Sequence, residues 1–216
     1  LSIELEEGER AEIVWFIGQT AGREEARLLI ERYRRADVNA LLGEVIRQWD
    51  DLLGVVQVHT PERPMDLLLN RWALYQTLVC RVWARAAFYQ SRGAYGFRDQ
   101  LQDVMALSVA ARDVTREHLL RAAARQFVEG DVQHWWHPPS GRGVRTRCSD
   151  DFLWLPLAVS RYVLNTGDTG VLDEPIRFLE GRQVNADEDS YYDLPGRSEE
   201  PASLYEHCVR AIKRGL

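Results

Sequence analysis

The sequence predicts a mainly α-helical fold, on three observations. Apolar residues recur at helical spacing from residue 23 to residue 89 and again after residue 98. Strand-like patterns are confined to residues 3–18 and to short pieces of residues 130–150. The segment at residues 165–168, Asn-Thr-Gly-Asp, both ends one helical pattern and starts the next. We therefore expect successive helices joined by loops that converge on one end of the domain.

The elements follow in order along the chain. Residues 3–18 alternate between apolar and polar side chains, which predicts one or two strands. Two charged amphipathic helices, over residues 23–31 and 37–53, suit a solvent-exposed linker. The helix predicted at residues 64–89 is apolar on most sides, so we expect it to be buried. Further helices are predicted at residues 98–110, 113–128, 151–165, 170–181 and 201–213. The acidic, aromatic residues 184–196 are predicted to be a solvated connector rather than a wall of a sugar-binding cleft.

Composition excludes several classes of protein. The chain has 216 residues, 45% of them hydrophobic and 28% charged, as in an ordinary globular domain. Its net charge of −6 argues against a nucleic-acid partner. The apolar runs fall short of the roughly 18 residues of a membrane helix, so we expect no membrane contact by this segment and a cytoplasmic location. The chain opens on Leu1 rather than Met, and we expect it to be a piece of a longer protein.

The cysteines and histidines predict neither a disulfide framework nor a metal site. Cys80, Cys148 and Cys208 are an odd, widely spaced set without the spacing of metal ligands. His134 and His137 are three residues apart but lack a clear third ligand.

The most informative stretch is residues 95–103, Tyr-Gly-Phe-Arg-Asp-Gln-Leu-Gln-Asp. At about 100° per residue, its polar side chains fall within an arc of roughly 140° of one helix; they are Arg98, Asp99, Gln102 and Asp103. Planar donors and acceptors packed this closely suit a polyhydroxylated ligand, whose hydroxyls each donate and accept hydrogen bonds. The alternative is a solvated helix face on which the charges pair with one another.

A long aromatic segment, residues 130–143, is rich in glycine and proline, which makes it hard to assign to a regular element. Long loops of this kind often carry function on a rigid scaffold. Because successive side chains point in different directions, we expect one of Trp135 and Trp136 to line a pocket and the other to pack in the core. Trp136 is our candidate for stacking on a sugar ring.

A local basic cluster follows, formed by Arg142, Arg145 and Arg147. Two interpretations stand. The cluster binds an anion, or it pairs with Asp150 and Asp151.

Three segments of the chain resemble the catalytic region of glycoside hydrolase family 94, the inverting glycoside phosphorylases. They are residues 95–103, residues 134–151 and residues 203–208, Ser-Leu-Tyr-Glu-His-Cys. Within the family the likeness is greatest to the phosphorylase-like region of the cyclic β-1,2-glucan synthases, and it covers nearly the whole chain. It implies that residues 61–216 are the first part of an (α/α)6 barrel, residues 21–60 a helical linker and residues 1–20 the end of a β-sandwich domain.

The resemblance also implies residue roles. Arg98 and Asp99 would hold the non-reducing-end sugar, Arg92 is the nearest candidate for a further sugar-binding arginine, and Asp150 and Asp151 would shape the pocket. In the family, inorganic phosphate is the co-substrate that attacks the anomeric carbon, and a single carboxylic acid protonates the leaving oxygen. No other cofactor is implied. That acid lies in a Gly-Asp-Trp-Asn-Asp motif, which these 216 residues do not contain, so we expect no catalytic residue in this chain.

The function implied by the resemblance is part of a glycoside phosphorylase or glycosyltransferase acting on β-linked glucans. It would serve inverting phosphorolysis, or chain-length control in cyclic β-1,2-glucan synthesis. Its partners would be a β-glucan oligosaccharide or polysaccharide and the remainder of the parent chain, which would be tethered to the inner membrane if it is a glucan synthase. The alternative is a non-catalytic oligosaccharide-binding module.

Overall fold

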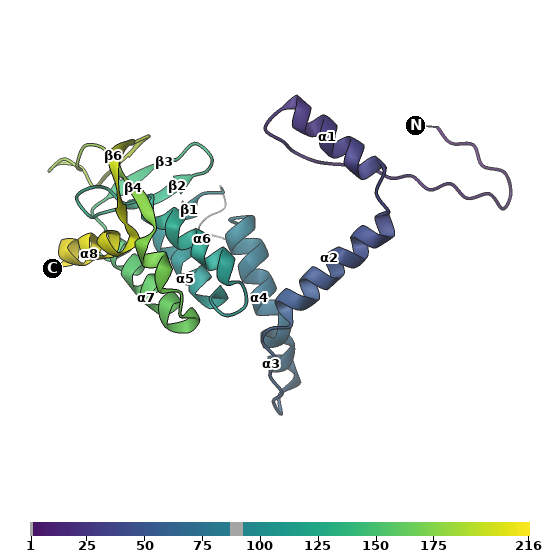
Figure 1. The fold of residues 1–216 in the computed structure, drawn as a ribbon, viewed down its shortest axis with the longest axis horizontal. Helices are drawn as coiled ribbons and strands as arrows, with labels where there is room; N and C mark the ends of the chain where they lie inside the picture. Colours follow the sequence, from purple (N-terminus) through teal and green to yellow (C-terminus); the bar gives the residue numbers. More distant parts are fainter. Residues whose placement is uncertain (1, 87–92) are drawn as a thin grey trace. The chain divides into compact units, whose positions relative to one another are not determined.

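The computed structural model describes residues 2–86 and 93–216. It is mainly helical, as the sequence predicts (Figure 1). The chain divides into two compact units, one ending at Gln48 and the other spanning Trp49–Leu216. Among the described residues, no helix combines the length and the apolar character needed to cross a bilayer.

The first unit contains helices but no strand among its described residues. The prediction of strands at residues 3–18 is wrong, because residues 2–20 are irregular and pair with no other segment. A strand requires a partner for its backbone N–H and C=O groups, whatever the alternation of its side chains. Helix α1 (Arg23–Arg34), which has no buried residue, and helix α2 (Val38–Leu53) confirm the two predicted amphipathic helices.

A continuous helical segment opens the second unit. It consists of α3 (Arg63–Leu67), α4 (Ala73–Tyr75) and two stretches of π-helical hydrogen bonding, Leu68–Trp72 and Gln76–Trp83. The helix predicted at residues 64–89 is confirmed as far as Trp83; residues 84–86 are not helical, and residues 87–89 lie outside the described residues. Its predicted burial on most sides is wrong: one stripe, including Leu78 and Val82, is buried, while Trp72 and Trp83 are more than half exposed.

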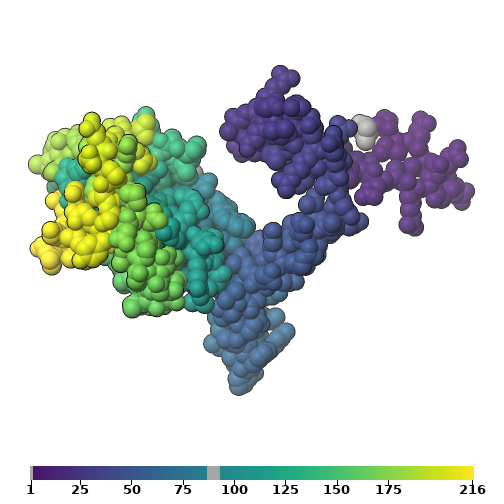
Figure 2. Space-filling view, viewed as in Figure 1, coloured from purple at the N-terminus to yellow at the C-terminus, as the bar shows by residue number. Residues whose placement is uncertain are grey.

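The main core lies among α5 (Phe97–Leu107), α6 (Arg112–Ala123) and α7 (Trp154–Thr166), which pack against one another beside the strands (Figure 1). The space-filling view shows these helices in one closely packed body, with the C-terminal residues in yellow on its surface (Figure 2). Helix α5 buries Phe97, Leu101 and Val104, which are spaced by four and three residues and therefore lie on one face of the helix.

Helix α8 (Leu204–Gly215) ends the chain. It begins where the Ser203 hydroxyl accepts a hydrogen bond from the Glu206 backbone N–H, a standard N-terminal cap. On its inner face His207 is fully buried and contacts the Gln126 side chain and the Ile176 carbonyl. The Ser-Leu-Tyr-Glu-His-Cys segment therefore serves packing and capping.

Four short strands form an antiparallel sheet in the order β1 (Tyr95–Gly96), β2 (Gln133–His137), β3 (Arg142–Thr146) and β5 (Ser190–Asp193). The strands predicted within residues 130–150 are confirmed as β2 and β3. Strand β5 lies within residues 184–196, which were predicted to be a connector throughout.

A second antiparallel sheet pairs β4 (Pro175–Glu180) with β6 (Gly196–Ser203). The helix predicted at residues 170–181 is wrong: a short 3-10 helix, Thr169–Asp173, leads into β4. Ile176 and Phe178 are buried while Arg177 between them is exposed, the period-two pattern of a strand.

Candidate functional site

The candidate site is built where the start of α5 meets the segment that follows β3. Gly96 caps α5, so Arg98 and Asp99 stand in its first turn, on the face opposite the buried Phe97. Arg98 Nη1 lies 3.0 Å from Asp150 Oδ2, an ion pair across 52 residues of sequence. The Asp99 carboxylate is also close enough to raise the pKa of Arg98. The structure thus brings together three of the predicted residues, Arg98, Asp99 and Asp150.

Asp150 is the most heavily contacted carboxylate of the site. The Cys148 thiol donates to its Oδ1 at 3.1 Å, and the Trp154 indole N–H lies 3.5 Å from its Oδ2. The thiol hydrogen bond and then the Arg98 guanidinium lower the pKa of Asp150. Because the side chains of Arg98 and Asp150 are 42% and 51% exposed, solvent or a ligand can reach both.

A β-bulge turns the His134 side chain toward the neighbouring carboxylate, Asp151. Gln133 pairs with Arg145, and Trp135 pairs with the next residue of β3, Val144. His134, between them, has no partner in β3 and is the extra residue of the bulge. Bulges of this kind re-aim a side chain. His134 Nδ1 lies 2.5 Å from Asp151 Oδ2, and this hydrogen bond raises the pKa of His134. Asp151 itself is 1% exposed, which makes it a supporting rather than an accessible residue.

One of the two tryptophans packs in the core as expected, but it is Trp136, the residue that we chose for stacking on a sugar. Trp136 is fully buried in the core, against Tyr95 and Phe97, so the prediction that it stacks on a sugar needs correction. The cause is its register, since Trp136 pairs with Tyr95 and Gly143 in the middle of the sheet. Trp135 is half-buried and lies 5.5 Å from the Tyr192 ring.

The other predicted site residues lie apart from this cluster or outside the described residues. The Asp103 carboxylate forms an ion pair with Arg81 at 2.9 Å, and this pair joins α5 to the preceding helical segment. Burial raises the pKa of Asp103, and the Arg81 hydrogen bond opposes that shift. Gln102 is exposed on the same helix. Arg92 lies outside the described residues.

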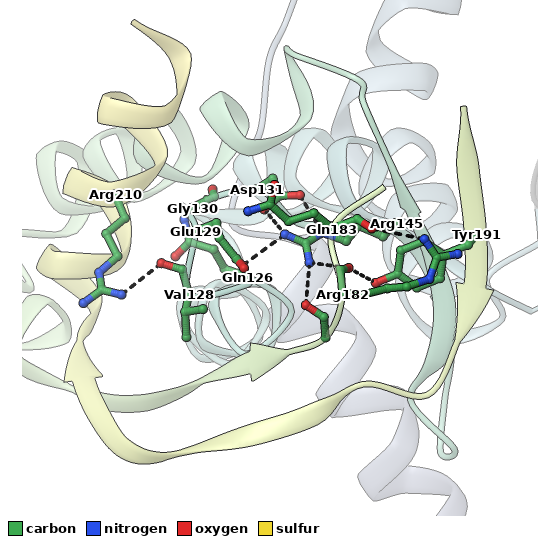
Figure 3. Close-up of polar contacts among 11 residues, drawn as sticks. Gln126, Val128, Glu129, Gly130, Asp131, Arg145, Arg182, Gln183, Tyr191 and Arg210 are labelled. Atoms are coloured by element: carbon green, nitrogen blue, oxygen red, sulfur yellow. Dashed lines mark hydrogen bonds and ion pairs between the residues drawn. The ribbon is translucent and has the colours of Figure 1, made fainter. Parts of the chain in front are cut away.

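The sequence left open whether the basic cluster binds an anion or pairs with Asp150 and Asp151. Arg145 of this cluster pairs with other carboxylates. Arg145, whose side chain is 1% exposed, binds Asp131 through Nε at 2.7 Å and Nη2 at 2.6 Å, and Glu129 at 3.0 Å (Figure 3). Its Nη1 donates to the carbonyls of Gly181 and Arg182 at 3.1 and 2.8 Å.

This network ties the sheet to the segment that leads into β5. Burial is the largest single influence on Arg145 and opposes its charge, but the combined hydrogen bonds and charges of Asp131, Tyr191 and Glu129 outweigh burial and raise the pKa of the guanidinium. Arg145 and Asp131 also line an open pocket of about 370 Å³ that extends to Cys148. Spacing could not reveal this arrangement, because the arginine's partners lie on both sides of it in the sequence.

Three residues of the site escaped the sequence analysis as functional residues: His134, Cys148 and Trp154. Their only signal was position, since all three flank or lie within the segment that carries Asp150 and Asp151. The convergence on Asp150 and Asp151 became visible only once the bulge and the turn after β3 were in place.

The family model described as "Glycosyl hydrolase 94 superfamily, catalytic domain" matches residues 48–216. The chain belongs to the glycoside hydrolase 94 family. It is 43% identical over 211 residues to the cyclic β-(1,2)-glucan synthase NdvB of Rhizobium meliloti (strain 1021). That alignment covers 97% of this chain and 7% of the synthase.

Phosphorylases are further relatives of this glycoside hydrolase 94 chain. The N,N'-diacetylchitobiose phosphorylase of Vibrio proteolyticus is 28% identical over 237 aligned residues, which cover 96% of this chain and 27% of that enzyme. The solabiose phosphorylase of Paenibacillus borealis is 29% identical over 164 residues, which cover 76% of this chain and 20% of that enzyme. The chain therefore spans about a quarter or less of the length of these relatives.

Proposed function

We propose that this chain supplies part of the non-reducing-end sugar site of an enzyme that acts on β-linked glucans. The reaction would be inverting phosphorolysis, or chain-length control in cyclic β-1,2-glucan synthesis. The observation that carries the proposal is the half-exposed ion pair between Arg98 and Asp150, with Asp99 beside it in the first turn of α5.

The chemistry of this group suits sugar hydroxyls. The Arg98 guanidinium is a planar donor, and the carboxylates of Asp99 and Asp150 are acceptors, so neighbouring hydroxyls find both kinds of partner. The pair is exposed enough for a hydroxyl to insert between or beside its members, while the buried Asp151 holds the supporting segment through His134.

The family and the relatives support a wider assignment, which we also propose. Residues 61–216 would form the first part of an (α/α)6 barrel, with residues 21–60 as a helical linker. Residues 1–20, which the resemblance assigns to the end of a β-sandwich domain, form no strand among their described residues. Inorganic phosphate would be the co-substrate and β-glucan the ligand. The general acid would come from outside these 216 residues, which contain no Gly-Asp-Trp-Asn-Asp sequence.

The test measures the binding of sophorose and cellobiose to the 216-residue chain by calorimetry or ligand-observed NMR. Arg98→Ala is expected to weaken binding about 10- to 100-fold, because it removes hydrogen bonds to a charged group worth roughly 1.5–3 kcal/mol. Arg116→Ala is the matched control, since Arg116 pairs with Asp168 and Glu174 and is not part of the site. Equal losses in the two variants, or no binding by the unmodified chain, would refute the assignment.

The same preparation tests the absence of the acid. Incubation with phosphate and β-linked oligosaccharides is expected to release no glucose 1-phosphate, since general acid catalysis contributes ~10²–10⁴-fold and the motif that carries the acid in the family is absent from these residues. Robust turnover would show that the acid lies within this chain, and Asp150 and Asp151 would be the first residues to replace. Binding without turnover, if it persisted in the parent protein, would instead favour an oligosaccharide-binding module.

A further inference from the structure

Three potential metal ligands meet at the edge of the candidate site. His134 comes from the bulge in β2, Cys148 from the turn after β3, and Asp151 from the start of the 3-10 helix Asp151–Leu153. One ligand atom of each, an imidazole nitrogen, a thiol sulfur and a carboxylate oxygen, lies within 4.8 Å of the other two. We propose that these residues bind a thiophilic divalent cation such as zinc.

A second observation points to a ligand at the same place. Asp151 Oδ1 is buried and has no hydrogen-bond partner among the described residues, although Asp151 is 1% exposed. A charged oxygen that is buried without a partner costs free energy, and in native structures such an oxygen is usually satisfied by a bound water or ion. A cation held between Asp151, His134 and Cys148 satisfies that oxygen.

The donor set selects the class of cation. Nitrogen, sulfur and oxygen donors are those of zinc sites, whereas magnesium and calcium take oxygen donors almost alone. In a tetrahedral zinc site the ligand atoms lie roughly 3.3–3.7 Å apart. The present ligand atoms lie within 4.8 Å of one another, and His134 Nδ1 is 2.5 Å from Asp151 Oδ2. Side-chain adjustments of about 1 Å, which replace this hydrogen bond by bonds to the cation, bring the cluster to that spacing. The fourth position is left to water, as in zinc sites with three protein ligands.

The surrounding charge also favours a cation. Asp150 stands beside the cluster, with its Oδ1 3.1 Å from Cys148 Sγ, and Asp151 is itself one of the three ligands. A divalent cation held there has two carboxylates beside it.

The sequence predicted no metal site, because the cysteines and histidines lack the spacing of zinc motifs. The folded chain brings them together from separate segments. This binding proposal does not depend on the sugar-binding role proposed above, and each can fail without the other.

The test uses the 216-residue chain without a polyhistidine tag, freed of metal by a chelator and titrated with Co²⁺. We expect one equivalent to bind with a thiolate-to-cobalt charge-transfer absorption and the visible bands of tetrahedral cobalt, and we expect Zn²⁺ to displace it. Cys148→Ser is expected to abolish the charge-transfer band and to weaken cobalt binding at least tenfold. His134→Gln is expected to weaken binding similarly, and it spares the buried carboxylate.

Cys80→Ser is the matched control, since Cys80 is a half-buried thiol on another helical segment whose partner is Gln76. It is expected to keep the wild-type spectrum and affinity. Circular dichroism of each variant shows whether it remains folded. The proposal is overturned if the unmodified chain develops no charge-transfer band, or if folded Cys148→Ser binds cobalt as tightly as Cys80→Ser does.

Discussion

Replacing Arg145 by Met tests how strongly the buried ion-pair network holds the sheet. Met keeps much of the length of the side chain and removes its charge and donors. Five hydrogen bonds would be lost: two to Asp131, one to Glu129 and two to backbone carbonyls of the segment that leads into β5. The Asp131 side chain, 11% exposed, would remain in place without a counter-charge.

The expected cost follows from the burial of what is left behind. Removing one member of a buried ion pair costs about 3–5 kcal/mol, because the other charge stays desolvated and unpaired. In a chain of this size each kcal/mol lowers the melting temperature by roughly 2–4 °C, so the expected decrease is about 6–20 °C. This is a large part of a total stability of about 5–15 kcal/mol.

Urea unfolding followed by tryptophan fluorescence measures the effect, and Arg116→Met is the matched control. Arg116 also binds two carboxylates, Asp168 at 3.1 Å and Glu174 at 2.6 Å, but all three side chains are about a third exposed. Its replacement is expected to cost no more than about 1 kcal/mol. If the two variants lose equal free energy of unfolding, the buried network of Arg145 does not stabilise the fold as argued.

Three further predictions concern packing, pH and capping. Gly143→Ala is expected to cost about 1–3 kcal/mol in urea unfolding, because a Cβ there would come within 2.8 Å of Trp136 Cβ and closer still to a backbone carbonyl; an unchanged unfolding midpoint would contradict this. Burial lowers the pKa values of His118 and His207 to about 4, so the unfolded chain binds more protons below pH 6.5 and stability falls as the pH drops from 7 towards 4, by up to about 3 kcal/mol for each histidine. His118→Phe should therefore flatten the dependence of stability on pH, and an unaltered slope would count against the assignment. Ser203→Ala removes the cap of α8 and is expected to cost about 1 kcal/mol, whereas Ser203→Asp, which can also cap, should retain most of the stability.

Helical spacing predicted the helices well where burial is one-sided. In α5 the residues Leu101, Val104 and Leu107 lie three apart and are all buried, so the pattern and the packing agree. The chain from Pro175 to Glu180 shows the opposite case. Its alternation of Ile176, Arg177 and Phe178 was available in the sequence, but the helix-starting signal at residues 165–168 drew the prediction of a helix too far along the chain.

The candidate site was only partly predictable. Arg98 and Asp99 share one helical turn, so their proximity follows from the period of the helix. The contact between His134 and Asp151 depends on a bulge and on the turn after β3, and neither leaves a periodic trace in the sequence. Trp136 could not be distinguished from Trp135 for the same reason, because one extra residue changes which side chain faces the core.

Because of the bulge in β2, the side chain at position 134 can change without altering the register of the sheet. Deleting a residue from a regular strand turns every later side chain to the other face. At His134 the neighbours on either side, Gln133 and Trp135, already pair with adjacent residues of β3. Losing His134 would therefore leave Trp136 opposite Gly143 and the core intact, so this position can gain or lose a functional side chain while the register of the sheet is inherited unchanged.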